Sequence, residues 1–284
     1  MKNFFLITNL PKDPDLTITN GIAVYLRDRG GHVDVRSFKG QGKDRHTGTE
    51  EVPEDTDCII VLGGDGTLMR AAADLSTLDI PLLGINLGTL GYLAEIDRAS
   101  IYPALDTLLA GEYQIEKRML LRGVVRRGEE CLYSGIALND IFVSREGKPR
   151  VITLRNYVNN AYLNEYRADG LIVATPTGST GYSLSAGGPI IEPRARLFLM
   201  TPLAAHTLNA RSVILPEESR IRIEVGEGRD GSMEHALASF DGEANIPLVT
   251  GDHVDIRKSS RVVRIVKTRN DSFFETLRKK MKDR

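Results

Sequence analysis

The hydrophobic and polar residues of this chain follow two different patterns, one in each half. In the first 116 residues, short apolar runs alternate with segments whose apolar residues recur at helical spacing. The predicted strands are Phe4–Thr8, Val33–Val35, Cys58–Leu62 and Pro81–Asn86, and the predicted helices are Leu16–Arg29, the segment after Gly66, and Ser100–Gly111. This alternation indicates an open α/β domain of the Rossmann-like type with a parallel sheet.

Residues 117–267 carry the second pattern, in which strands follow one another without helices between them. The predicted strands are Met119–Val125, Cys131–Val143, Val151–Val158, Ala161–Tyr166, Ile221–Val225, His253–Arg257 and Val262–Val266. Such a run of strands predicts a β-rich, β-sandwich-like second domain. A final helix over Asp271–Arg284 is expected to return to the first domain, so the predicted domains are residues 1–116 with 268–284, and residues 117–267.

The overall charge gives no reason to expect a nucleic-acid or membrane partner. The formal net charge is −1 and the pI is about 6.5, so the chain has no broad attraction to polyanions. No stretch reaches the roughly 18 consecutive apolar residues of a membrane-spanning helix. The apolar run near the N-terminus is too short for a signal peptide, and we therefore expect a cytoplasmic protein.

Cysteine and histidine positions favour no metal centre held by the protein itself. Cys58 and Cys131 are the only cysteines, and both lie in apolar, strand-like segments, so we expect two buried thiols. The five histidines form no pair at the spacing of zinc ligands. A divalent metal that arrives with nucleotide phosphates remains compatible with this sequence.

A glycine-rich turn, Gly63-Gly64-Asp65-Gly66-Thr67, joins the strand Cys58–Leu62 to the next helix. Such a turn presents free backbone N–H groups and the positive end of the helix dipole, which favour phosphate, and the Thr67 hydroxyl is expected to cap the helix. Asp65 does not suit phosphate binding alone, because a carboxylate about 5 Å from a phosphate charge is repelled by roughly 3 kcal/mol at an effective dielectric near 20. Asp65 therefore shares a metal with the phosphates, accepts a proton from an attacking hydroxyl, or only shapes the turn.

Two further polar segments resist an explanation by packing. Asn139 and Asp140 interrupt an apolar strand, where such residues are unfavourable unless a bulge or a ligand accommodates them. Residues 169–189 lead from a buried strand into a run of hydroxyl side chains and glycines, which suits a sugar or nucleotide. A flexible linker is the alternative, but Pro176, Tyr182 and Leu184 at close spacing argue against one.

The glycine turn resembles the signature shared by NAD kinases, diacylglycerol-type lipid kinases and, more distantly, phosphofructokinases. Combined with Asn139-Asp140 and residues 169–189, the motif set is similar to that of bacterial NAD kinases. This resemblance implies transfer of the γ-phosphoryl group of ATP, as a Mg²⁺ complex, to the 2′-hydroxyl of the adenosine ribose of NAD, which yields NADP. It also implies a homodimer or homotetramer.

The resemblance further implies roles for individual residues. Asp65 would accept the proton of the 2′-hydroxyl beside Gly66, while Asn139 and Asp140 would hold the adenosine. The rest of the NAD pocket would comprise Asp169, Thr180, Gly181, Tyr182, Ser183, Leu184 and Ser185, with basic contacts from Arg150 and Arg167 and a weaker position at Ala204; the phosphate loop would comprise Gly63, Gly64, Gly66 and Thr67. Two positions depart from the family pattern, Glu243 where Gln is expected and Gly181 where Ala is common.

Two other functions stay open at the level of sequence. A lipid-alcohol kinase would share the glycine turn, but it should present an apolar patch or a basic amphipathic surface, and the sequence shows neither clearly. A non-catalytic NAD(P) sensor would keep the pocket and lose turnover. The presence of Asp65 argues against such a sensor.

Overall fold

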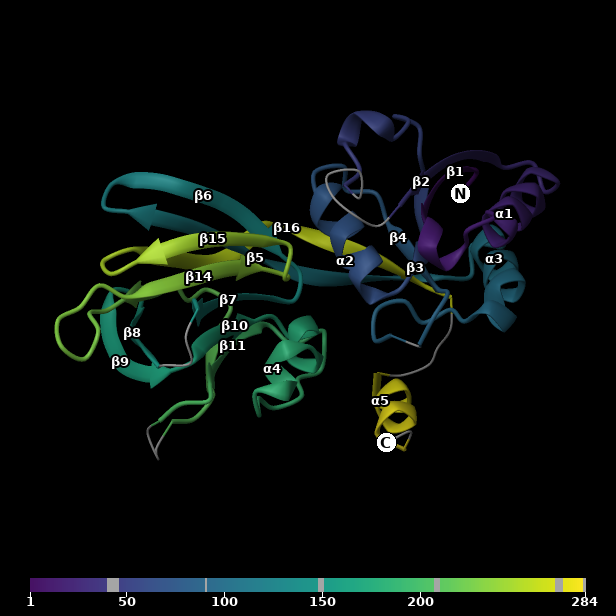
Figure 1. The fold of residues 1–284 in the computed structure, drawn as a ribbon. Helices are drawn as coiled ribbons and strands as arrows, with labels where there is room; N and C mark the ends of the chain where they lie inside the picture. Colours follow the sequence, from purple (N-terminus) through teal and green to yellow (C-terminus); the bar gives the residue numbers. More distant parts are fainter. Residues whose placement is uncertain (40–45, 90, 148–150, 207–209, 269–272, 283–284) are drawn as a thin grey trace. The chain divides into compact units, whose positions relative to one another are not determined.

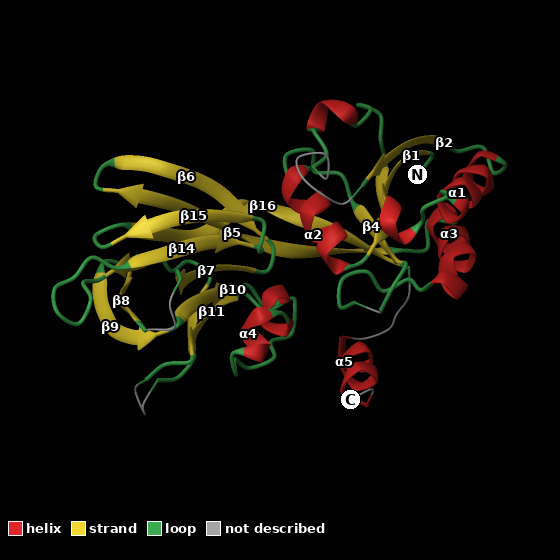
Figure 2. Ribbon diagram, viewed as in Figure 1, coloured by secondary structure: helices red, strands yellow, loops and turns green. Residues whose placement is uncertain are grey.

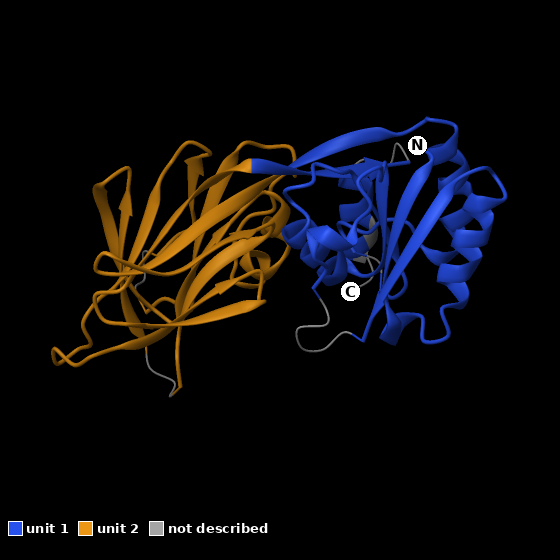
Figure 3. Ribbon diagram, turned by 90° about the horizontal axis from the view of Figure 1, so that it is seen from above, with its two compact units in different colours: residues 1–118, 261–284 blue, residues 119–260 orange. Residues whose placement is uncertain are grey.

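The chain forms two compact units, shown in different colours in Figure 3. The computed structural model describes residues 1–39, 46–89, 91–147, 151–206, 210–268 and 273–282. Unit 1 comprises residues 1–118 and 261–284, and unit 2 comprises residues 119–260. These boundaries lie inside two continuous strands, β5 (Gln114–Arg127) and β16 (His253–Lys267), where the sequence pattern does not change. The sequence-based boundaries at residues 116 and 267 consequently differ from them by a few residues.

Unit 1 contains a parallel sheet in the order β2-β1-β3-β4 (Figure 1). Its strands are β1 (Asn3–Asn9), β2 (His32–Phe38), β3 (Cys58–Gly63) and β4 (Leu82–Asn86). Every residue of β3 and β4 is buried, as expected for central strands that are covered on both faces. β4 also pairs with the C-terminal part of β16.

Helices cover both faces of this sheet (Figure 2). They are α1 (Thr17–Arg27), α2 (Asp65–Asp74) and α3 (Ile101–Leu109), and α5 (Phe273–Lys282) completes unit 1. α1 and α3 share one apolar cluster with the strands, while Leu68 of α2 packs against Gly84 of β4. The α5 residue Phe273 lies with its ring centroid 6.5 Å from that of Tyr92, so the prediction that the last helix returns to the first domain is confirmed.

Unit 2 is built from strands, with only short helical turns. The strands after β5 are β6 (Glu130–Ala137), β7 (Asp140–Arg145), β8 (Ile152–Val158), β9 (Ala161–Ala168), β10 (Gly170–Ala174), β11 (Leu197–Leu203), β12 (Val213–Pro216), β13 (Ile221–Val225), β14 (His235–Phe240) and β15 (Ala244–Val249). One sheet has the order β12-β11-β10-β7-β14-β15, and the other places β16, β13, β8 and β9 side by side, with β5 on β16 and β6 on β5. The short helix α4 (Tyr182–Ser185) follows β10.

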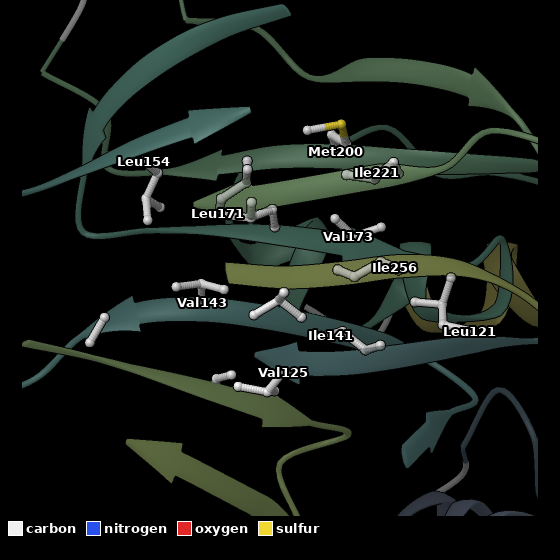
Figure 4. Packing of buried hydrophobic residues seen from close by; sticks show 14 of the residues in the cluster. Leu121, Val125, Ile141, Val143, Leu154, Leu171, Val173, Met200, Ile221 and Ile256 are labelled. Carbon is white, nitrogen blue, oxygen red and sulfur yellow. The ribbon is translucent and has the colours of Figure 1, made fainter. Parts of the chain in front are cut away.

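The core of unit 2 lies between these two sheets, with side chains from both directed into it (Figure 4). One sheet contributes Ile141, Leu171 and Met200, and the other contributes Leu154 and Ile256. All five side chains are at most 1% exposed. Facing sheets around an apolar core make unit 2 a β-sandwich, and the predicted fold class is confirmed.

Two details of the strand predictions and one of the cysteine predictions are wrong. The apolar run Cys131–Val143 is divided between β6 and β7, because the chain leaves the ladder at Leu138 and Asn139. Conversely, the two predicted strands in residues 253–267 form a single strand, β16. Cys58 is buried as expected, but Cys131 is exposed because it lies at the start of β6, which pairs only with β5.

Within the described residues, no helix is long and apolar enough to cross a membrane.

Truncation of the central sandwich residue Leu171 to alanine should lower the free energy of unfolding by about 2–5 kcal/mol, because it removes buried methyl groups and leaves a cavity. Leu163→Ala is the matched control, since Leu163 lies on β9 of the same unit and its side chain is 38% exposed. We expect the control to cost less than about 1 kcal/mol. Urea unfolding measures both, and equal losses would contradict the assignment of the core.

Candidate functional site

The glycine turn follows β3 in unit 1 and starts α2. Gly64 occupies the N-cap position in an extended conformation, and Asp65 is the first helical residue. The expectation that Thr67 caps this helix is wrong, because no side chain makes the cap hydrogen bond. Thr67 is instead the third helical residue, buried against the backbone of Gly63, and its hydroxyl oxygen accepts a 3.3 Å hydrogen bond from the side-chain amide of Asn9.

The Asp65 carboxylate is fastened by three backbone N–H groups from the segment after β4. Tyr92 N–H donates to Oδ2 at 2.7 Å, while Leu93 and Ala94 N–H donate to Oδ1 at 3.2 and 3.0 Å. The approach is so close that a Cβ atom on Gly91 would overlap the carboxylate, so this position requires glycine. Asp65 therefore does more than shape its own turn, because it ties the first glycine turn to the second.

These contacts do not use all the hydrogen-bond acceptor positions of the Asp65 carboxylate. A carboxylate offers about four acceptor positions, two on each oxygen. Oδ1 accepts two of the backbone bonds and Oδ2 accepts one. Because the side chain is only partly buried, Oδ2 can accept one further hydrogen bond from a ligand hydroxyl.

The second glycine turn, residues 87–91, is shaped by Asn86. The buried Asn86 amide donates to the Thr89 carbonyl at 2.8 Å, and its oxygen accepts from Gly88 N–H at 2.7 Å. Lys12 reaches the same place, because a Cβ on Gly88 would lie 3.0 Å from the Lys12 ammonium nitrogen. Sequence reasoning missed Lys12, since an exposed lysine carries no local signal of its position in the fold.

In unit 2, Asn139 and Asp140 lie at the junction of β6 and β7, where the carboxylate of Asp241 holds the backbone. Leu138 N–H donates to Oδ2 of Asp241 at 2.6 Å, and Asn139 and Asp140 N–H donate to Oδ1 at 2.8 and 3.0 Å. Asp241 itself has left-handed backbone, with φ of 49°. The sequence analysis did not assign Asp241 a role, and its only sequence signal is the turn-forming Asp-Gly pair at 241–242.

Asp140, which is buried, and Asp241, which is partly buried, form an acidic pair. Burial and the nearby Asp241 carboxylate raise the pKa of Asp140 from 3.8 to about 7. Burial also raises the pKa of Asp241 to about 6, although the hydrogen bonds from three backbone N–H groups lower it. Both effects arise because a carboxylate removed from water, beside a like charge, favours its neutral form.

Most hydroxyl groups after β10 bond within the protein. Thr175 donates to the Leu138 carbonyl at 2.6 Å, and Ser179 donates to the Pro176 carbonyl at 2.7 Å while accepting from Ile191 N–H at 3.0 Å. Ser183 is fully buried and lies 3.0 Å from the Thr201 hydroxyl. These side chains therefore fix the shape of the segment.

The structure brings Asn139 together with the hydroxyl-rich segment. A Cβ on Gly178 would overlap the Asn139 carbonyl, and a Cβ on Gly181 would lie 3.4 Å from the Asn139 side-chain nitrogen. Thr180 is partly buried in the same turn, with its hydroxyl 3.2 Å from the Thr177 carbonyl. Two segments that are about 40 residues apart in sequence thus form one surface of unit 2.

Tyr182 presents a partly open ring next to this surface. It is 40% exposed, and its ring packs edge-on against Phe142 with centroids 5.4 Å apart. Burial, together with the negative charges of Asp140 and Asp169, raises the pKa of the Tyr182 hydroxyl. Asp169 is itself paired with Arg145, whose Nε lies 2.9 Å from Oδ1.

The remaining predicted site residues have less defined surroundings. Leu184 is partly buried, whereas Ser185 and Arg167 are exposed. Ala204 is also exposed and has left-handed backbone with φ of 45°, just after β11. Arg150 lies outside the described residues. Glu243 belongs to the Asp241 turn, where its N–H donates to the Phe240 carbonyl at 2.8 Å.

Metal-binding side chains are sparse in the part of the chain that the structure describes. No group of three or more His, Cys, Asp or Glu side chains there could hold a metal ion. Mg²⁺ is commonly held by one or two carboxylates together with substrate phosphates. The half-buried Asp65 carboxylate beside two glycine turns is compatible with that kind of site.

Comparisons with known proteins agree for both units. The family model described as the ATP-NAD kinase N-terminal domain matches residues 10–113, and the model of the ATP-NAD kinase C-terminal domain matches residues 138–268. The NAD kinase of Lachnospira eligens is 45% identical over 295 residues, covering 99% of this chain and all of the relative. The NAD kinase of Agathobacter rectalis is 46% identical over 282 residues, covering 99% of each chain.

Solved structures show the same fold. Yeast NADH kinase complexed with NADH aligns with a TM-score of 0.79 and 26% identity, covering 98% of this chain and 86% of that chain. An NAD kinase from Archaeoglobus fulgidus in complex with ATP aligns with a TM-score of 0.76 and 25% identity, covering 99% and 98%.

Gly178→Ala should destabilise unit 2, because the new Cβ would overlap the Asn139 backbone and force the turn to move. We expect a loss of about 1–3 kcal/mol in the free energy of unfolding. Gly181→Ala, in the same turn, is the matched control, since its Cβ would approach other atoms no closer than 3.3 Å. Thermal and urea unfolding compare the two, and the assigned contact is wrong if both variants lose the same stability.

The acidic pair predicts a pH dependence of stability. The pKa of Asp140 is raised to about 7 in the folded protein, so this carboxyl binds a proton between about pH 4 and 7 that the unfolded chain releases. Folding is therefore favoured at the low end of this window, and stability is lost as the pH rises through 7.

Asp140→Asn removes the ionising group, so stability relative to the unmodified protein should improve by at least about 1 kcal/mol between pH 5 and pH 8. Urea unfolding at pH 5, 6, 7 and 8 measures the difference. Asp230→Asn serves as the control, because Asp230 is exposed and its change should not alter the slope across this window. Parallel pH profiles for the original chain and Asp140→Asn would contradict the assigned proton binding.

Proposed function

This chain belongs to the ATP-NAD kinase family and is an NAD kinase, and from that premise we propose that Asp65 is its catalytic proton acceptor. The observation that carries this proposal is the geometry of the Asp65 carboxylate. Three backbone N–H groups hold it in place, and Oδ2 retains capacity for one more hydrogen bond. A fixed carboxylate with one available acceptor position suits general-base catalysis.

In the proposed reaction, the 2′-hydroxyl of the adenosine ribose of NAD donates its proton to Oδ2 of Asp65. The 2′-oxygen attacks the γ-phosphorus of ATP, and the bond from that phosphorus to the bridging β–γ oxygen breaks. The products are NADP and ADP, with the proton on Asp65 before its release to solvent. Mg²⁺ bound to ATP would neutralise the charge that develops on the phosphoryl oxygens.

Unit 1 has the features expected for holding the phosphates of ATP. α2 begins at Asp65, directly after the glycines, and the N-terminus of a helix favours an anion. The Lys12 ammonium beside Gly88 adds a positive charge at the second glycine turn. Asn86 keeps that turn in shape through its two side-chain hydrogen bonds.

Unit 2 has the features expected for recognition of the nucleoside. We infer that Asn139 and Asp140 hold the adenosine, because Asp241 fixes their backbone and they lie beside the turn of Thr180 and Gly181. The exposed ring of Tyr182 can stack on a base or a nicotinamide. For Asp169, Ser183, Leu184, Ser185, Arg167, Arg150 and Ala204, the proposal keeps the family assignment as contacts to NAD.

The proposal also covers the conditions of the reaction. The donor is the Mg²⁺ complex of ATP, supported by the ATP complex of the Archaeoglobus fulgidus relative. The protein acts in the cytoplasm as a homodimer or homotetramer, with no membrane or nucleic-acid partner, in line with its nearly neutral net charge of −1. No observation favours the lipid-kinase or sensor alternatives.

Asp65→Asn should lower kcat by at least about 10², because the amide cannot take up the proton of the attacking hydroxyl. The affinity for NAD should change little, because the proposed nucleoside contacts lie in unit 2. The measurement is NADP formation from NAD, ATP and Mg²⁺, with NAD binding determined separately by calorimetry.

Asp97→Asn is the control for lost hydrogen bonds, because Asp97 also accepts from a backbone N–H in unit 1, that of Ser100 at 2.9 Å. This variant should lose little stability, because asparagine caps a helix about as well as aspartate, and it should keep its kcat. Turnover by Asp65→Asn at the original rate would refute the catalytic role. A fall in kcat matched by Asp97→Asn would attribute the loss to folding instead.

A further inference from the structure

A polar hollow lies on unit 2, on the outer face of the sheet formed by β5, β16, β13 and β8. Its volume is about 570 Å³. The four arginines that line it are Arg122, Arg220, Arg222 and Arg257. Glu224 and Asp255 are the two acidic side chains in its wall, so the lining has an excess of two positive charges. None of these residues belongs to the proposed catalytic machinery.

Strand register explains why these side chains gather. Arg222 on β13 lies opposite Asp255 on β16 and opposite Tyr157 on β8. Because side chains alternate between the two faces of a sheet, Arg220 and Arg257 share the outer face with Arg222. The intervening residues Ile221 and Ile256 point the other way, into the core.

One part of this charge is already compensated within unit 2. Arg222 makes a two-pronged ion pair with Asp255, at 2.7 and 3.1 Å. Glu224 accepts from Arg155 at 3.3 Å. Both acidic residues of the hollow therefore pair with an arginine, Asp255 with Arg222 and Glu224 with Arg155. Neither is paired with one of the other three arginines of the hollow.

The remaining three arginines have no acidic partner among the residues that the structure describes. Arg220 and Arg257 are exposed and make no side-chain ion pair within that part of the chain, while Arg122 donates only to the neutral Ser134 hydroxyl, at 3.2 Å. Like charges around one hollow repel one another, and an anion in the hollow would relieve that repulsion. Arginine guanidinium groups suit phosphate and carboxylate oxygens through paired N–H donors.

We propose that this hollow, here called the arginine hollow, is a second binding site that takes a small organic phosphate with at least two negative charges. Arg122, Arg220 and Arg257 bind the phosphate, and the Tyr157 ring with Val124 forms the wall for the organic part. The volume of about 570 Å³ lies inside the range of small-molecule sites.

The first experiment uses inorganic pyrophosphate as the probe for the anion site. Isothermal titration calorimetry at low ionic strength compares the original chain with Arg257→Ala and with Arg229→Ala. Arg229 is an exposed arginine of the same unit outside the hollow, so its variant removes the same charge elsewhere. We expect Arg257→Ala to weaken one binding event at least tenfold and Arg229→Ala to match the original chain.

The second experiment tests the wall of the hollow with adenosine 5′-monophosphate. Tyr157→Leu should weaken one binding event for this nucleotide and leave that of pyrophosphate unchanged, because only the nucleotide has a base to contact the ring. Both arginine variants and Tyr157→Leu should keep the kcat that is measured without pyrophosphate or adenosine 5′-monophosphate, which verifies that they fold.

Three results would overturn the proposal. Equal pyrophosphate affinity in the original chain, Arg257→Ala and Arg229→Ala would show that this anion binds elsewhere. An equal loss of pyrophosphate affinity in both arginine variants would show that binding responds only to the net charge of the protein. Sedimentation velocity supplies the third, because a smaller assembly in Arg257→Ala with unchanged pyrophosphate binding would make the hollow a contact between copies of the chain.

Discussion

The candidate binding surfaces of the two units depend on the same kind of interaction, a carboxylate that accepts three backbone N–H groups. Asp65 fastens the segment Tyr92–Ala94, and Asp241 fastens Leu138–Asp140. In both cases one oxygen takes two bonds and the other takes one. A loop held in this way keeps its backbone in a single conformation, because moving it would leave a desolvated charge without donors. Binding groups on these loops are therefore positioned before any ligand arrives.

The surroundings of the two carboxylates differ, and this difference separates their chemistry. Asp65 is partly exposed at the start of α2, where the helix dipole stabilises negative charge. Burial raises the pKa of both Asp140 and Asp241, and the nearby Asp241 carboxylate raises that of Asp140 further. The first arrangement leaves a carboxylate partly open to solvent, whereas the second binds a proton near neutrality at the place proposed for the nucleoside. The charge of the Asn139–Asp140 surface is therefore sensitive to pH in the physiological range.

Sequence reasoning recovered what local patterns determine. The buried run of β3 followed by glycines predicted the turn at Asp65, and the polar pair at Asn139 and Asp140 marked the place where the chain leaves one strand for the next. It failed where the outcome depends on distant residues. Asp241 holds residues about 100 positions earlier, and Lys12 reaches a turn 76 positions later, so neither relation leaves a local signal. The exposure of Cys131 likewise follows from the pairing of β6 with β5 alone, which the apolar character of its segment does not reveal.

The hydroxyl-rich segment after β10 shows why a motif can identify a family without naming the atoms that touch the ligand. Thr175, Ser179 and Ser183 are buried and bond to neighbouring backbone or side-chain oxygens. Replacing any of them would leave a buried polar group without its partner, so the sequence is constrained by the shape of the turn. The groups that this turn leaves accessible, above all the Tyr182 ring and the Asn139 amide beside Gly181, are the best placed for the proposed contacts to NAD. The density of hydroxyls in this motif thus reflects the rigidity that recognition requires, and only a minority of them are placed to form direct contacts.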